Sequence, residues 1–438
     1  MMNNQATRED KQGNEGVKAT RSFNEVIGER VESFYRDKVE KRWNGGFITR
    51  GRVPGREDIL VNHNDYLGIS GRAEIRTAIC DAARKSGAGM MMSSVFIGEA
   101  GAQYALEQEY ASWLNAPRTA LCQSGYAANV GLLQSIAGTG TPIYVDMLAH
   151  ASIWEGVTSA NAKPVPFRHN DLEHLERQAR RYGPGIIAVD SIYSTAGDTC
   201  PLAELVEFAA SLGCVLVVDE SHSLGVCGSD GSGLVRALGL ESRVHFRTAS
   251  LAKACVGRAG LIACDERFVE YFASEARPAI FSSSLLPHDL AGLRASLGLV
   301  RDGTRERARL RSVVKRVREG LNDLSFPVDR DGTQIVPIEA GGETDTLILR
   351  DALESGGVFG AVFCAPATAV NRSMVRVSLN AALTDDELTR MLEVFARIRE
   401  EVGVRRWRSY RQRMRVNETH DVSSEVVPTL ISEQTALV

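Results

Sequence analysis

One lysine of this chain stands among small and apolar residues, in the stretch Thr248-Ala249-Ser250-Leu251-Ala252-Lys253-Ala254-Cys255-Val256-Gly257-Arg258-Ala259-Gly260. An ammonium group in apolar surroundings loses hydration, so its pKa falls and its amine becomes available as a nucleophile. That is the property a Schiff-base lysine needs. A lysine with a buried stem and a head that reaches water explains the same stretch. The residues upstream decide between the two interpretations.

The upstream stretch is Cys214-Val215-Leu216-Val217-Val218-Asp219-Glu220-Ser221-His222-Ser223-Leu224-Gly225, an apolar run that ends on a carboxylate. Asp219 alone could cap a helix or bind a metal. A strand-end aspartate and a lysine joined by a β-α unit, however, suit a pyridoxal phosphate (PLP) site. There the lysine bonds the aldehyde, and the carboxylate keeps the pyridine nitrogen protonated. His222, predicted one helical turn beyond Asp219, can bond the phenolic oxygen of the ring.

Further apolar runs separated by helical patterns predict an α/β fold with a parallel sheet covered on both faces. The predicted strands are Ala120–Cys122, Pro142–Asp146, Gly185–Asp190 and Cys214–Val218. In such sheets ligands bind beyond the carboxyl ends of the strands. The residues predicted at or just past those ends are Ser124, Asp146, His150, Asp190, Asp219, His222 and Lys253.

A phosphate site is predicted at Ser124-Gly125-Tyr126, because the start of a helix offers backbone N–H groups to an anion. The hydroxyls of Thr248 and Ser250 add donors from the lysine side. Each feature has an ordinary alternative, since Ser124 can simply cap its helix and a lone His150 can be a packing histidine. The features gain specificity from their combination and order.

Five segments are predicted: a disordered N-terminus (1–22), a helix or arm (23–60), a large PLP-binding domain (61–298), a smaller α/β domain (299–403), and a basic, then disordered tail (404–438). One long helix is predicted from about Asp289 past Arg318. The arginines around Trp407 favour a solvated helix extension over a nucleic-acid or membrane contact.

The composition excludes several classes of protein. The chain has 438 residues, of which 44% are hydrophobic and 24% charged, and a net charge of −4, which argues against attraction to nucleic acid or membrane. No apolar run approaches the roughly 20 residues of a membrane helix. Met1–Thr20 lacks the apolar core of a signal peptide. The eight cysteines form no Cys-x-x-Cys pair, so a cytoplasmic protein without disulfides or a metal site is expected.

The motifs, in their order along the chain, resemble the α-oxoamine synthase family of PLP-dependent enzymes. They are Asn64-Asp65-Tyr66-Leu67-Gly68, Ser124-Gly125-Tyr126-Ala127-Ala128-Asn129, His150-Ala151-Ser152, the stretch from Asp219 to Gly225, and Thr248 to Lys253. The resemblance covers roughly Phe23 to Val402. It implies a fold-type-I PLP transferase, with a mostly parallel seven-stranded sheet in the large domain and a smaller α/β C-terminal domain.

The resemblance also implies roles for individual residues. Lys253 bonds the cofactor, Asp219 contacts the pyridine nitrogen, and His222 contacts the ring oxygen. His150 stacks on the ring, Ser194 lies near the phenolic oxygen, and Ser250 helps the backbone at Gly125 and Tyr126 to hold the phosphate. A second subunit lends Phe281–Leu285, including Ser282 and Ser283, which implies a homodimer with a shared active site. The implied substrate-binding residues are Arg376, which grips the amino acid carboxylate, Asn64 and Tyr66.

The segment Gly89–Gly98 departs from the biosynthetic members, which usually carry an arginine and a Ser-Gly there. Its methionines resemble the quorum-sensing autoinducer synthases, which join a medium-chain acyl-CoA to S-adenosylmethionine or 2-aminobutyrate and give an α-aminoketone signal. Met90, Met91, Met92 and Phe96 could line an apolar acyl pocket, or could equally be core residues.

Three alternatives stay open. The first is a housekeeping α-oxoamine synthase that uses glycine, alanine or serine, of the aminooxononanoate synthase or glycine C-acetyltransferase type. The second is another PLP enzyme on the same scaffold, such as an aminotransferase or a lyase. The third, a non-catalytic PLP-binding regulator, is the least favoured because the chain has no recognisable DNA-binding module.

Overall fold

A computed structural model of the chain describes residues 27–36, 52–89, 91–96, 101–365 and 367–411. The chain divides into two units, Met1–Gly55 and Arg56–Val438. In the first unit, residues 27–34 are helical, as the predicted N-terminal helix requires. The segments predicted to be disordered, at 1–22 and beyond Asn417, lie outside the described residues.

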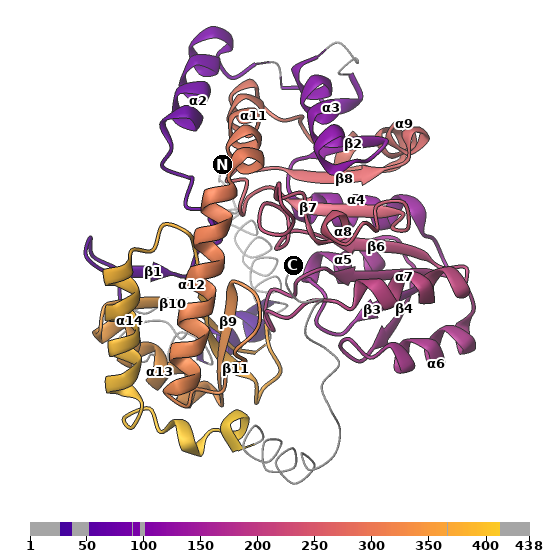
Figure 1. The fold of residues 1–438 in the computed structure, drawn as a ribbon. Coiled ribbons are helices and arrows are strands. Elements are labelled where there is room, and N and C mark those ends of the chain that lie inside the picture. The colour runs from indigo at the N-terminus through magenta and orange to yellow at the C-terminus, as the bar shows by residue number, and fades with distance from the viewer. Residues whose placement is uncertain (1–26, 37–51, 90, 97–100, 366, 412–438) are drawn as a thin grey trace, which may run out of the picture. The chain divides into compact units, whose positions relative to one another are not determined.

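A seven-stranded sheet forms the centre of the second unit, in the order β2-β8-β7-β6-β5-β3-β4 (Figure 1). Only β8 runs antiparallel to its neighbours, so the predicted mostly parallel sheet is confirmed. The strands are β2 (Arg118–Cys122), β3 (Pro142–Asp146), β4 (Lys163–Phe167), β5 (Ile186–Asp190), β6 (Val215–Asp219), β7 (Phe246–Ser250) and β8 (Gly260–Cys264). The apolar pattern does not predict β4, which carries Pro164 and Pro166 at the sheet edge, where a missing N–H is tolerated.

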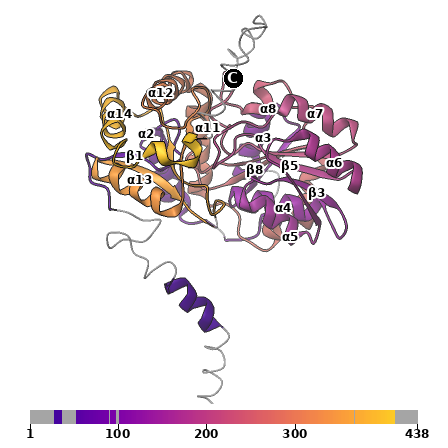
Figure 2. The ribbon, with the colours of Figure 1, turned by 90° about the horizontal axis from the view of Figure 1, so that it is seen from below.

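The two faces of the sheet pack against different helices, because successive side chains of a strand point to opposite faces. In β5, Ile187 and Val189 belong to one apolar cluster, and Ile186 and Ala188 belong to another. The first cluster includes α3, α6, α7 and α8, and the second includes α4, α5 and α9. Figure 2 shows α3, α7 and α8 on one side of the sheet and α4 and α5 on the other. These helices are α3 (Ala102–Leu114), α4 (Gly125–Ile136), α5 (Ala151–Ser159), α6 (Leu172–Tyr182), α7 (Leu202–Ser211), α8 (Leu234–Ala237) and α9 (Glu266–Glu275).

A second, four-stranded sheet has the order β1-β10-β11-β9. Its strands are β1 (Ile59–Val61), β9 (Ile335–Gly341), β10 (Val358–Phe363) and β11 (Ser373–Ser378), and its helices include α13 (Glu343–Ser355) and α14 (Asp385–Ile398). β1 pairs in parallel with β10, although almost 300 residues separate them. Residues 59–61 therefore join the C-terminal sheet; the domain limits themselves stay a prediction.

Two helices stand where one long helix is predicted from Asp289 past Arg318, so that prediction is wrong. α11 (Pro287–Asp302) ends at Gly303, and α12 (Thr304–Asp323) begins after it. Gly303 has the non-helical dihedral angles φ −75° and ψ 40°. Arg307 donates to the carbonyl oxygens of Val300 and Arg301 at the end of α11, which is how a basic side chain stabilises a helix C-terminus. With α2 (Ala73–Ser86) and the short α10 (Arg277–Ile280), these helices complete the described set.

The basic tail starts with a 3₁₀ turn and a buried tryptophan rather than a solvated helix, and of its described residues only 408–411 are helical. Val404–Arg406 form a 3₁₀ turn, and Trp407 is buried with its ring centroid 6.0 Å from that of Phe326. The Ser409 hydroxyl donates to the Glu339 carbonyl oxygen at 2.6 Å. The pattern of residues in the tail does not predict the contact between Trp407 and Phe326, because Phe326 lies in a distant part of the sequence.

Candidate active site

Polar side chains converge where β5, β6 and β7 end. Strand register places Asp219 opposite Asp190 on one side and Thr248 on the other. Asp190, Asp219 and Thr248 are all buried. The carboxyl ends of these strands therefore carry the chemistry that the sequence predicts there.

Lys253 lies in the tight loop that joins β7 to β8. The loop closes through backbone hydrogen bonds from Gly257 to Leu251 and from Val256 to the Lys253 carbonyl oxygen. Val256 adopts φ 43°, an unusual value for a β-branched residue and a sign of local strain. Burial lowers the pKa of Lys253, and the charges of Asp219 and Asp190 oppose that shift. A reactive amine thus lies within the electrostatic reach of the strand-end carboxylates.

Asp219 is held from both sides. Its Oδ1 accepts a hydrogen bond from the backbone N–H of Ser221 at 2.8 Å, and its Oδ2 accepts one from the Asn129 amide at 2.6 Å. Asn129 belongs to α4, whose first turn carries the predicted phosphate site. The orientation of this carboxylate therefore depends on a helix 90 positions away.

His150 caps α5 from the neighbouring strand end. Its backbone N–H donates to Asp190 Oδ2 at 2.9 Å, and its ring Nδ1 lies 2.7 Å from the Ser152 hydroxyl. Burial lowers the pKa of His150, against the charge of Asp219 and with that of Lys253. The lowered pKa favours the neutral form of the ring.

His222 lies in a run of turns at 221–226, where the Leu224 N–H donates to the Glu220 carbonyl oxygen at 2.8 Å, so the predicted turn is present but does not continue as a helix. The side chain is still buried close to the site, with Nδ1 2.6 Å from the Tyr66 hydroxyl. The Tyr66 hydroxyl lies 3.2 Å from Asn64 Oδ1, which also accepts from Arg376 Nη2 at 3.2 Å. Burial lowers the pKa of His222 well below its usual value. Three residues expected on the substrate side are thus joined to His222 in one chain of contacts.

The N-terminus of α4 lies directly against β7 and β8. Ser124 caps the helix by accepting from the Ala127 N–H at 3.0 Å. A Cβ at Gly125 would lie 2.6 Å from Ser250 Cβ, and one at Gly260 would lie 2.1 Å from the Ser124 carbonyl oxygen. In the described part of the chain, the N–H groups of Gly125 and Tyr126 have no acceptor. This is a cradle for an anion at a helix N-terminus.

Comparison with known proteins identifies the family to which a chain with this site belongs. Residues 56–395 match the family Aminotransferase class I and II. The chain belongs to this family. A CAI-1 autoinducer synthase from Vibrio campbellii is 40% identical over 373 residues, which cover 85% of this chain and 95% of that protein. An 8-amino-7-oxononanoate synthase from Anaeromyxobacter sp. is 35% identical over 336 residues, which cover 76% of this chain and 84% of that protein.

Among solved structures, a serine palmitoyltransferase with PLP has a TM-score of 0.79 and 26% identity. That match covers 88% of this chain and 99% of the other. Within the aminotransferase family the chain is thus a PLP-dependent acyltransferase of the α-oxoamine synthase group. The family, the cofactor and the enzyme class predicted from the sequence are confirmed.

The residues present fit PLP. A phosphate needs N–H donors with no other acceptor, and Gly125 and Tyr126 offer them. A pyridine nitrogen needs a carboxylate, and Asp219 is buried at the end of β6. An aldehyde needs an amine with a lowered pKa, and Lys253 has one. Each of the three groups of the cofactor has a matching partner.

Other predicted contacts lie nearby, with partners of their own. The Ser194 carbonyl oxygen accepts from Arg376 Nη1 at 2.9 Å, and the Thr248 hydroxyl donates to Asn129 Oδ1 at 2.6 Å. The Ser282 hydroxyl donates to the Pro278 carbonyl oxygen, and the Ser283 carbonyl oxygen accepts from Gln123. The side chains of Met91 and Phe96 are exposed, whereas Met90 lies outside the described residues.

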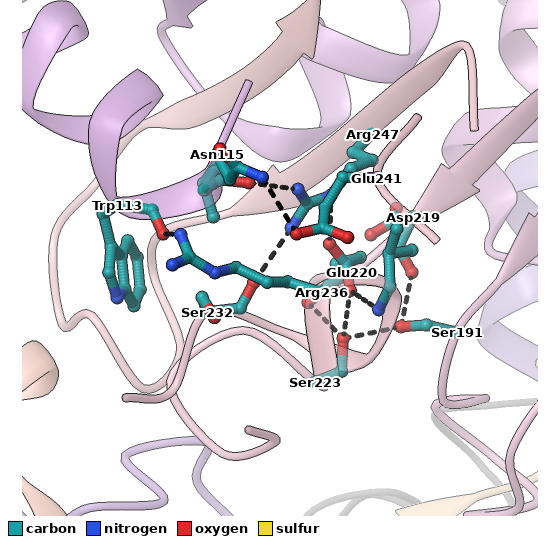
Figure 3. Close-up of polar contacts among 12 residues, drawn as sticks. Trp113, Asn115, Ser191, Asp219, Glu220, Ser223, Ser232, Arg236, Glu241 and Arg247 are labelled. Carbon is teal, nitrogen blue, oxygen red and sulfur yellow. Dashed lines mark hydrogen bonds and ion pairs between the residues drawn. The ribbon is translucent and has the colours of Figure 1, made fainter. Parts of the chain in front are cut away.

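The sequence did not predict a buried ion pair next to Asp219, between Glu220 and Arg247 (Figure 3). Glu220 Oε2 accepts from Arg247 Nε at 2.7 Å, and both side chains are buried. Arg247 also donates to the carbonyl oxygens of Leu114 and Ser232. One signal was available, because Glu220 directly follows the apolar strand β6 and Arg247 lies inside the adjacent strand β7, and charged residues at buried positions are usually paired.

Neither a metal centre nor a membrane span is seen in the described parts of the chain. No cluster of three or more His, Cys, Asp or Glu residues there has the arrangement of a metal site. The described helices are all too short or too polar to cross a bilayer.

Proposed function

We propose that this enzyme joins a medium-chain acyl-CoA to an amino acid or to S-adenosylmethionine, and that the α-aminoketone product is a quorum-sensing signal. The observation that carries the proposal is the 40% identity to an autoinducer synthase over most of both chains. The exposed apolar side chains of Met91, Val95 and Phe96 also support it, because the acyl chain of such a substrate needs an apolar surface.

PLP, when bound, supplies an aldehyde for the amino group and a ring that takes up electrons from the bond broken at Cα. The residues proposed to hold it are Lys253 at the aldehyde, Asp219 at the ring nitrogen, His222 and Ser194 at the ring oxygen, His150 on the ring face, and Ser124, Gly125, Tyr126, Thr248 and Ser250 around the phosphate.

The proposed reaction removes one proton from Cα, expels two groups, coenzyme A and CO₂, and returns one proton to Cα after CO₂ has left. The Lys253 amine takes the proton from the substrate Cα, a task that its lowered pKa favours. Arg376 binds the substrate carboxylate; its buried Nε has no partner in the described part of the chain. The Cα–acyl carbon bond forms as the carbon–sulfur bond breaks, and coenzyme A leaves as a thiol. Loss of the carboxyl group as CO₂ leaves the aminoketone.

Product mass spectrometry tests this proposal. Purified enzyme with PLP is given acyl-CoAs of increasing length, each with glycine, alanine, serine, 2-aminobutyrate or S-adenosylmethionine, while released coenzyme A is measured. A medium-chain α-aminoketone from one of the last two amino donors is expected. Preference for glycine, alanine or serine would assign a housekeeping α-oxoamine synthase, for which the 35% identical relative argues. Keto acid formation without an acyl-CoA would assign an aminotransferase.

A Lys253→Ala variant checks the role of the lysine. It should lose both the absorption band of the covalent bond between Lys253 and PLP and the release of coenzyme A. Full activity in this variant would overturn the assignment of Lys253.

We also propose that the enzyme works in the cytoplasm as a homodimer, in which the segment around Ser282 and Ser283 serves the partner's phosphate site. The 80% exposed Phe281 at the start of this segment supports an intersubunit contact. Mixing a Lys253→Ala variant with a Ser282→Ala/Ser283→Ala variant tests sharing. Heterodimers should regain activity in one of their two sites, and mixtures that stay inactive would contradict a shared site.

A further inference from the structure

A hydrogen-bonded relay connects the two strand ends that carry Asp219 and His150. Asn129 occupies its centre and is buried, with 2% of its surface exposed. The Asn129 amide nitrogen lies 2.6 Å from Asp219 Oδ2 and 2.9 Å from the Ser152 hydroxyl, and its oxygen lies 2.6 Å from the Thr248 hydroxyl. Ser152, which is fully buried, continues the relay to His150 Nδ1 at 2.7 Å.

The chemistry of these groups sets the direction of every hydrogen bond. An ionised carboxylate only accepts, so Asn129 must present its NH₂ group to Asp219. The second hydrogen of that NH₂ group goes to Ser152, whose oxygen therefore accepts. Asn129 Oδ1 is left to accept from Thr248. The amide thus uses both hydrogens and its oxygen and has one consistent orientation.

The directions of these hydrogen bonds also determine the tautomer of His150. Since the Ser152 oxygen accepts from Asn129, its hydroxyl hydrogen is available for His150 Nδ1. The backbone N–H of Ser152 also points to Nδ1, at 3.2 Å, and an N–H group can only donate. Nδ1 therefore carries a lone pair, and the ring proton resides on Nε2. Protonation of Nδ1 would disrupt both contacts.

We propose that Asn129 and Ser152 are positioning residues that fix the Asp219 carboxylate and hold His150 as the neutral Nε2–H tautomer. The proposal deepens the proposed function and rests on it for the identity of the bound group, PLP. The titratable groups that face His150 are Asp219, Asp190 and Lys253. Nε2–H is the donor that His150 then offers to a bound cofactor or substrate.

The tautomer is tested on the full-length protein with ¹⁵N-labelled histidine, before and after PLP is added. His150 is assigned by the signal lost in a His150→Gln variant. A pyridine-like Nδ1 and a pyrrole-like Nε2 are expected at neutral pH. In Ser152→Ala, the ring should take up a proton at a pH higher by roughly half to one unit, because one hydrogen bond to the neutral form is lost.

Ser135→Ala is the matched control. Ser135 is a buried serine of α4 whose hydroxyl donates only to the Leu132 carbonyl oxygen. This change should leave the His150 signals as they are. A proton on Nδ1 in the wild type, or identical His150 titrations in Ser152→Ala and Ser135→Ala, would overturn the proposal.

Equilibrium binding of PLP tests the other half of the relay. Asn129→Ser should weaken PLP binding by roughly tenfold or more, because Asp219 loses a donor that holds it in place. Should Asn129→Ser fail to fold, the Ser152→Ala titration still decides the proposal. Wild-type affinity in a folded Asn129→Ser variant would contradict the role of Asn129. If the wild type binds no PLP, the proposed function fails, whereas the tautomer measurement keeps its meaning.

Discussion

At the scale of single residues, burial sets the chemistry of the charged groups. Burial lowers the pKa of Lys253 and raises that of Asp190, which also lies beside the Asp219 charge. The composition around Lys253 indicates its dry setting, because its sequence neighbours are small and apolar. Asp190 and Asp219 lie opposite each other in adjacent strands, although they are far apart in the sequence. Their electrostatic coupling is therefore a property of the sheet.

His169 gives a pH prediction. Burial lowers the pKa of His169, but hydrogen bonds and charges of Asp146 and Asp198 outweigh it and raise the pKa to about 9. The protonated form therefore stabilises the fold below the ordinary histidine pKa of about 6.5, and this stabilisation is lost as the pH rises to about 9. His169→Gln should reduce the fall in unfolding free energy across that window by about 2 kcal/mol, measured by urea denaturation. His174→Gln is the control; equal pH slopes for the wild type and His169→Gln would contradict the prediction.

The buried Glu220–Arg247 pair gives a second prediction. Arg247→Met leaves the Glu220 carboxylate buried without its cation, so the unfolding free energy should fall by about 3–5 kcal/mol. Combining it with Glu220→Gln should restore part of the loss. The exposed pair of Arg243 and Glu207 provides the control, since Arg243→Met should change stability little. Equal changes in unfolding free energy for Arg247→Met and Arg243→Met, measured by urea denaturation, would contradict this prediction.

At the scale of elements, the contact of α4 with β8 shapes the anion cradle. Gly260→Ala would place a methyl group against the Ser124 carbonyl oxygen and push the first turn of α4 away from the sheet. We expect a lower melting temperature and weaker PLP binding, both measured on the purified protein. Gly298→Ala in α11 is the control, because no heavy atom lies within 4 Å of its added Cβ. That change should stabilise the fold by about 0.5–1 kcal/mol. Unchanged PLP affinity in Gly260→Ala would show that the cradle tolerates a shift of α4.

The elements differ in how far they could be predicted. β3, β5 and β6 are apolar up to the aspartate that ends each strand and are buried on both faces, so composition alone identifies them. β4 escapes prediction because its prolines are tolerated only at the sheet edge, and an edge is a property of strand order. The break at Gly303 likewise depends on Arg307 and the carbonyl oxygens that it contacts.

At the scale of the whole second unit, the C-terminal segment completes the apolar core. Trp407→Ala should lower the unfolding free energy by about 3–5 kcal/mol, because a fully buried indole is replaced by a cavity next to Phe326. Arg408→Ala, an exposed change one residue further on, is the control. Urea denaturation measures both. A Trp407→Ala variant as stable as Arg408→Ala would mean that this segment does not contribute to the core.

The local pattern of residues determines the type of fold and the positions of the reactive groups. An apolar strand followed by a polar residue is readable from a few neighbours, and parallel sheets gather such ends at one edge. This is why the amino-acid sequence alone is enough to place Asp219 and His150 at one edge of the sheet, whereas Lys253 is indicated by its small and apolar neighbours.

Only the tertiary structure decided the partners of those groups. Asn129 meets Asp219 across 90 positions, and Tyr66 meets His222 across 156. Hydrogen bonds reach about 3 Å and depend on orientation, so no spacing rule along the chain predicts them. The sheet order and the packing of α4 bring the donors to their acceptors, and the protonation states in the site follow from that packing.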